Sequence, residues 1–169
     1  MPFGRRFCTL TEQYIPKRRE PCALFLDDAF DSADAERLRV NGYRQIELFR
    51  EHFARDDGGK EQSVKDPRIL RFCNRHKWLL VTTDSDLRLT HIEEIKKLPD
   101  LAILATAHNT VAGIEEWVDG LIKVRRFVER EFRKRLRPWF AQFSRQGRIT
   151  TIYTITAMHG SRRIRPLEE

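Results

Sequence analysis

The chain has 169 residues, a length that suits one ordinary domain, because chains of this size seldom split into two hydrophobic cores. It contains no apolar run of the roughly 18 residues that cross a membrane and no cationic start followed by an apolar segment, so we expect a cytoplasmic protein without a membrane partner. The net charge of +7 is unevenly placed along the chain, and it favours a polyanionic partner over a neutral one.

The N-terminal 20 residues are predicted to form a basic arm outside the domain. They carry five cations and no periodic apolar pattern. Residues 21–166 are expected to form a single domain, which opens with the apolar run CALFLDD. Such a compact run predicts a buried strand, here one that ends at Asp27.

A helix and a second strand are predicted next. Asp31 or Ser32 can cap a helix that continues to about Val40, and Gly42 stands where a left-handed C-terminal residue is favoured. YRQIELF then predicts the second strand. His52 to Ser63, with DDGGK at its centre, has the composition of a loop.

The middle of the chain predicts a further helix, two strands and a short helix between them. DPRILRFCNRHK has apolar residues at helical spacing, with Pro67 in the first turn, where a missing N–H is tolerated. WLLVTT predicts the third strand and LAILATA the fourth, with a short helix around Ile92 to Leu98 between them.

The segment from Gly113 to about Arg137 predicts one long amphipathic helix that ends near Pro138. Residues 123–148 hold ten basic residues and two acidic ones, a net charge of +8, with five aromatic residues interleaved. Two interpretations stay open: these cations bind nucleic-acid phosphates, or they are solvated on a helix whose aromatic side chains face the core. The predicted nucleic-acid-binding side chains are Arg125, Arg126, Arg130, Arg133, Lys134 and Arg137.

The last predicted element is RITTIYTIT, a strand at an edge or in a final hairpin. Strands that alternate with helices indicate an α/β fold with right-handed crossovers. We therefore expect a three-layer sandwich, in which a mainly parallel central sheet carries helices on both faces.

Acidic residues follow two of the predicted strands. Asp27 and Asp28 end the first, and Asp84 and Asp86 end the third. Ligands of such sheets bind beyond the carboxyl ends of the strands, so both pairs fall on the edge where function is expected. Side chains at i and i+2 share a side, and hard ions such as Mg²⁺ and Mn²⁺ prefer carboxylate oxygens. A structural interpretation stays open too, because Asp66 and Asp84 could each cap a helix or turn.

The series LFLDDAF, then VKDPRILRFCNRHK, then WLLVTTDSDL resembles the PIN-like fold of short bacterial and archaeal proteins. The resemblance covers about residues 22–166 and is most specific from Asp66 to Leu87. It implies a ribonuclease that uses Mg²⁺ or Mn²⁺, often the toxin of a toxin-antitoxin pair, with RNA as substrate and an antitoxin as partner. The acids it assigns to catalysis are Asp27, Asp66, Asp84 and Asp86, and those assigned to the metal are the same four with Asp28.

Two features depart from the PIN-like pattern. Full-length PIN nucleases carry a further acid on an early helix, for which Glu36 and Glu47 are the candidates, and Leu87 replaces the usual phenylalanine. The alternative is a PIN-like module that binds RNA or a protein partner without cleaving. A homodimer is also compatible with the aromatic-rich helix.

A response-regulator receiver is a weaker alternative, with Asp27, Asp28, Asp84 and Thr106 at the corresponding strand ends. A receiver also needs a lysine after a fifth parallel strand, and no such strand is predicted before Lys123. The three cysteines lack CxxC spacing and the five histidines lack HxH or HxxxH spacing, so we expect neither a disulfide framework nor a zinc site.

Overall fold

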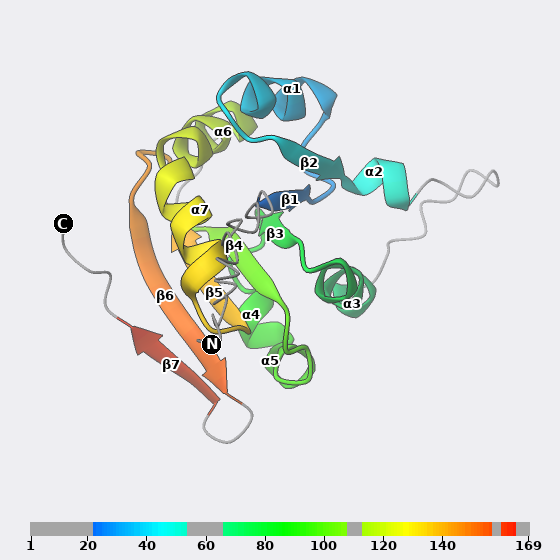
Figure 1. The fold of residues 1–169 in the computed structure, drawn as a ribbon, viewed down its shortest axis with the longest axis vertical. Helices are drawn as coiled ribbons and strands as arrows, with labels where there is room; N and C mark the ends of the chain where they lie inside the picture. The colour runs from blue at the N-terminus through cyan, green and yellow to red at the C-terminus, as the bar shows by residue number, and fades with distance from the viewer. Residues whose placement is uncertain (1–21, 54–65, 108–112, 157–159, 165–169) are drawn as a thin grey trace, which may run out of the picture.

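The computed structural model describes residues 22–53, 66–107, 113–156 and 160–164, so the predicted basic arm lies outside the described residues. The described chain forms one seven-stranded sheet with the order β2-β1-β3-β4-β5-β6-β7 (Figure 1). The strands are β1 (Ala23–Leu26), β2 (Gln45–Leu48), β3 (Leu79–Thr82), β4 (Ala102–Thr106), β5 (Trp139–Phe143), β6 (Ile149–Thr156) and β7 (Gly160–Ile164). The helices are α1 (Ser32–Val40), α2 (Phe49–His52), α3 (Asp66–His76), α4 (Leu87–Thr90), α5 (Ile92–Ile95), α6 (Ile114–Lys123) and α7 (Arg125–Lys134).

The sheet is parallel from β2 through β5, and only β6 and β7 pair antiparallel. The predicted α/β class with a mainly parallel sheet is therefore confirmed. β1 and β3 are buried along their whole length, as expected for strands covered on both faces. The final hairpin predicted for RITTIYTIT is present as β6 and β7.

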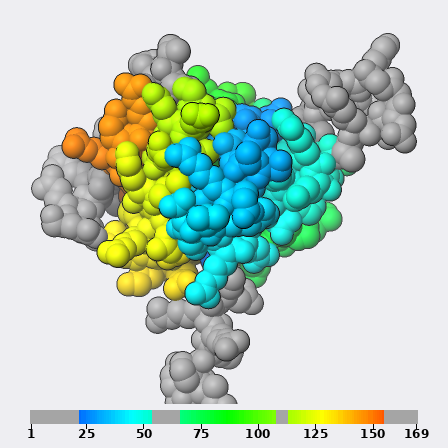
Figure 2. Space-filling model, turned by 90° about the horizontal axis from the view of Figure 1, so that it is seen from above, coloured from blue at the N-terminus to red at the C-terminus, as the bar shows by residue number. Residues whose placement is uncertain are grey.

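Alternate residues of each central strand contribute to two separate cores. Leu24, Leu26 and Leu104 pack with α1, α6 and α7, whereas Phe25 and Ile103 pack with α3, α4 and α5. Figure 2 shows α1 beside α6 and α7 on the first of these faces. Helices thus cover both faces of the sheet, which is the three-layer arrangement that the sequence predicts.

The first helix begins and ends as predicted. Asp31 accepts hydrogen bonds from the backbone N–H groups of Ala33 and Asp34, and Asp34 bonds back to the Asp31 backbone N–H in a capping box. Beyond the helix, Gly42 has a φ of 100°, a backbone conformation that glycine adopts without steric cost.

Two sequence predictions in the C-terminal half were wrong. The long helix predicted from Gly113 is divided at Val124 into α6 and α7, and α7 ends at Lys134. WFAQF, which we did not predict to be a strand, forms β5 in the middle of the sheet. Its aromatic residues belong to the core and not to a basic helix.

Candidate functional site

The strand order places the predicted acids beside a topological switch point. The chain leaves β1 toward β2 on one side, and later continues from β3 on the other side of β1. Parallel α/β sheets bind ligands in the crevice at such a point, beyond the carboxyl ends of the strands. Asp27 directly follows β1, and Asp84 and Asp86 follow β3, so the acids flank this switch point.

Asp27 is a buried carboxylate, with a side chain tied to both strands. It is 8% exposed, accepts a hydrogen bond from the Ala29 N–H at 3.1 Å, and accepts another across the switch point from the Thr83 N–H at 2.9 Å. Burial raises the pKa of Asp27 to about 6, although the hydroxyl of Thr82 and the two N–H groups act in the opposite direction. The fold thus holds a carboxylate where its charge is poorly solvated.

The turn after β3 is organised by side chains of the predicted site. Thr82 accepts from the Asp84 N–H at 3.0 Å and its hydroxyl also bonds to Asp27. The Asp84 carboxylate accepts from the Asp86 N–H at 2.8 Å. Asp84 therefore stabilises a turn, as the structural interpretation expects, while its side chain stays exposed at the strand end.

The two remaining predicted acids, Asp66 and Asp28, have different surroundings. Asp66 is the first residue of α3, and its Oδ2 lies 3.0 Å from Nε2 of His91, a residue with no predicted role. This pair joins the start of α3 to the start of α5. Asp28 is exposed next to Asp27.

The donor chemistry of the acids fits Mg²⁺ or Mn²⁺, which prefer carboxylate oxygens. Within the described ranges, however, these acids do not bring three ligand atoms within 4.8 Å of one another. The group that does so is Glu47, Glu51 and His52. Its members already bond to protein groups: His52 Nε2 lies 3.0 Å from Glu47, and Glu51 accepts from the Leu48 N–H at 3.1 Å.

Two polar residues that the sequence did not assign to the acidic site support the turn after β3. Gln142 on β5 donates to the Ser85 carbonyl at 3.4 Å and accepts from the Thr151 hydroxyl at 2.6 Å. Thr106, at the end of β4, donates to the Thr83 carbonyl at 3.0 Å. Both bonds join segments that are distant in the sequence, so spacing within one motif could not reveal them.

The predicted nucleic-acid-binding residues have unequal surroundings. Arg125 pairs with Glu129 at 2.9 Å, and Arg130 contacts the buried Glu131 at 3.2 Å. Arg137 donates to the backbone carbonyls of Lys77, Asp100 and Phe132. The exposed residues of the predicted set are Arg126, Arg133 and Lys134.

The structure contains a fifth parallel strand, β5, which the sequence did not predict. The missing strand was one reason to disfavour a receiver domain. β5 ends at Phe143 and is followed by Ser144, so the lysine that a receiver requires is missing from this position. Thr106 does lie at the end of β4, but its hydroxyl is used to hold Thr83.

Comparisons with known proteins found no matching family model, no significantly similar curated protein and no significantly similar solved structure. The PIN-like resemblance therefore stays a prediction. Among the helices in the described part of the chain, none has the length and apolar character that a membrane span requires.

Proposed function

We propose that this protein is a metal-dependent ribonuclease of the PIN-like type, which hydrolyses RNA phosphodiester bonds at the carboxyl edge of the sheet. The observation that carries the proposal is the buried carboxylate of Asp27, tied by the Thr83 N–H to the strand end that presents Asp84 and Asp86. Acids that follow two neighbouring strands thus flank the switch point of a parallel sheet, where ligands bind.

The surroundings of Asp27 fit a divalent cation. A buried carboxylate with a raised pKa gains from an adjacent positive charge, which would offset the cost of desolvation. Asp27 and Asp84 would hold Mg²⁺ or Mn²⁺, with Asp28, Asp66 and Asp86 as the additional acids. When bound, such an ion polarises a phosphodiester and activates water for attack.

The remaining residues of the site act by positioning. The Thr82 hydroxyl bonds to the Asp27 carboxylate and accepts from the Asp84 N–H, so it ties the Asp27 side chain to the backbone of the turn that presents Asp84. Neither candidate matches the acid that PIN nucleases carry on an early helix. Glu36 lies on the early helix α1 but is exposed and pairs with Arg39. Glu47 lies on a strand, β2, in register with Phe25, two residues before Asp27.

Binding without cleavage is the second candidate function, and it also rests on an observation. Asp66 is engaged with His91 and Asp84 with the Asp86 N–H, and the described acids do not converge as closely as a ready metal cage would. The role as a toxin with an antitoxin partner rests on the resemblance alone.

The test is cleavage of a mixed RNA pool by purified protein, with Mn²⁺ or with chelator, alongside Asp84→Asn. The matched control is Asp119→Asn, which removes an acid that pairs with Arg37 on α1, outside the proposed site. We expect cleavage by the unmodified protein and the control only with Mn²⁺. We expect Asp84→Asn to lose more than the roughly 10–100-fold that outer-shell changes cost.

Equal cleavage in all tubes would reject the metal-nuclease proposal. RNA that is retained on a filter with the protein but stays intact under every condition would favour the binding module.

A further inference from the structure

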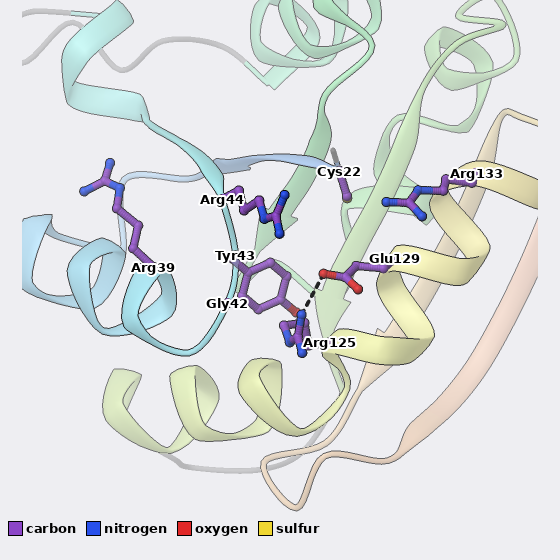
Figure 3. Close-up of a pocket in the computed structure, with 8 residues that line it drawn as sticks. All are labelled: Cys22, Arg39, Gly42, Tyr43, Arg44, Arg125, Glu129 and Arg133. Atoms are coloured by element: carbon purple, nitrogen blue, oxygen red, sulfur yellow. Dashed lines mark hydrogen bonds and ion pairs between the residues drawn. The ribbon is translucent and has the colours of Figure 1, made fainter. Parts of the chain in front are cut away.

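A pocket of about 520 Å³ lies at the opposite end of the sheet from the acids. Its lining includes Cys22, directly before β1, Arg44, directly before β2, and Arg133 in the last turns of α7 (Figure 3). Because β1 and β2 are parallel, the residues before them mark the amino edge of the sheet. The volume falls within the roughly 300–1,000 Å³ typical of small-ligand sites.

Arginines from three segments line this pocket. Among the residues that the structure describes, Arg44 and Arg133 have no hydrogen-bond or ion-pair partner, and Figure 3 shows both guanidinium groups directed into the space between the 42–44 segment and α7. Arg125 lies on the same side of α7 and pairs with Glu129 at 2.9 Å. Arg39 points away from the others and donates to the Ile46 carbonyl at 3.2 Å.

Two buried residues, Tyr43 and Cys22, form the described floor of the pocket, and neither carries a negative charge. Tyr43 is 1% exposed and donates to the Leu121 carbonyl at 2.8 Å. Cys22 is buried, and this burial raises the pKa of its thiol to about 12, so it stays neutral. Among the described residues of the lining, Glu129 is the one carboxylate, and it pairs with Arg125. No described acid therefore compensates the charges of Arg44 and Arg133.

Gly42 leaves room for the Arg125 guanidinium group to lie against the backbone. A Cβ atom placed on Gly42 would lie 3.0 Å from the Arg125 guanidinium carbon, and Gly42 has a φ of 100°. The absence of a side chain lets the guanidinium group rest on the turn before β2. Arg125 is therefore fixed within the pocket by Gly42 and Glu129 together.

We propose that this pocket binds the phosphate group of a nucleotide or an oligonucleotide. Guanidinium groups bind phosphate oxygens through paired, charge-assisted hydrogen bonds, and two of those present have no other partner among the described residues. The sequence placed phosphate contacts along one basic helix. The structure instead joins two of its arginines to Arg44 from the segment before β2. The inference does not depend on the proposed nuclease activity, because the acids lie at the other edge.

The test measures binding of three probes in the presence of chelator and about 150 mM salt, which screens non-specific attraction. The probes are AMP, adenosine and a fluorescent single-stranded RNA 12-mer. The test variant is Arg44→Ala/Arg133→Ala, and the charge-matched control is Arg75→Ala/Arg148→Ala, which removes two exposed arginines that lie outside the lining and outside the predicted nucleic-acid-binding set. All four arginines are exposed, so circular dichroism should report folded proteins.

We expect AMP to bind more tightly than adenosine, and the test variant to weaken binding of AMP, RNA or both at least tenfold, while the control changes it less than threefold. If the test variant binds AMP more weakly, a free nucleotide is a sufficient ligand. If only its RNA binding is weakened, the pocket binds a phosphate of the RNA backbone. Equal loss in the control would overturn the proposal in favour of general charge attraction. Two further results would overturn it. One is unchanged binding of both AMP and RNA by the test variant. The other is equal affinity of the unmodified protein for AMP and adenosine, together with unchanged RNA binding by the test variant.

Discussion

Burial makes Asp27 a costly residue for the folded chain. Its pKa of about 6 in the fold lies above the usual 3.8, so the folded state binds more protons than the unfolded state between these values. Stability therefore falls as pH rises through about 4 to 6 and stays lower above that range.

Replacing Asp27 with asparagine should stabilise the protein at pH 7.5. The raised pKa of Asp27, about two units above its usual value, corresponds to a gain in stability of at most about 3 kcal/mol when the charge is removed. About 1 kcal/mol of this gain is lost, because asparagine has only one acceptor oxygen for the two N–H donors that bond to Asp27. Urea denaturation at pH 7.5 and pH 4 would measure this, with Asp119→Asn as control. A variant that is less stable than the parent at both pH values would contradict the prediction.

At the scale of single residues, the sequence predicted where the acids stand and missed what holds them. Asp27 and Asp84 follow apolar runs, a pattern that is local and visible in the sequence. The bonds from Thr83 to Asp27 and from His91 to Asp66 span 56 and 25 positions, so only the folded chain brings these groups together.

Helix α7 is basic, but its arginines have different roles. Arg137, just beyond the helix, donates to three carbonyls and stacks over Phe132, with 4.2 Å from its guanidinium carbon to the ring centroid. Burial lowers its pKa. It connects the end of α7 to the segments that precede β3 and β4, which is a structural role.

We therefore expect Arg137→Ala to lower the free energy of unfolding by about 2 kcal/mol, as is typical when charged hydrogen bonds to the backbone are lost. Arg133→Ala, which removes an exposed residue, should change it by no more than about 0.5 kcal/mol. Chemical denaturation of both variants tests this. Unchanged stability with weakened RNA binding in Arg137→Ala would restore the role in RNA binding that the sequence suggested.

At the scale of elements, the early helices and strands were predictable and the region after β4 was not. The capping box and Gly42 mark the two ends of α1 within the local sequence. Val124, in contrast, separates α6 from α7 although no proline or glycine stands at that position.

The connections from β3 to β4 and from β4 to β5 run in the same direction across the sheet, but their helices pack on opposite faces, so the two crossovers have opposite hands. The right-handed crossover rule therefore fails for one of them.

At the scale of the whole molecule, the two proposed sites lie at opposite ends of the parallel strands and share no residue. Ligands at such separate sites are expected to bind without measurable coupling unless the fold changes between two states. Mn²⁺ should therefore raise the melting temperature equally in the unmodified protein and in Arg44→Ala/Arg133→Ala. AMP should raise it equally in Asp84→Asn, and a shift that depends on the other site would show coupling.

The proposed acidic site and the arginines of the pocket stand at opposite ends of the parallel strands. A polyanion that approaches from solution is attracted to the exposed arginines Arg44 and Arg133 of the pocket. A strand of four or five residues rises about 15 Å, and an RNA that occupies both sites has to span at least this height. If the proposed nuclease activity and the proposed phosphate pocket both hold, a substrate that uses both sites is an oligonucleotide, because a dinucleotide reaches only one end at a time.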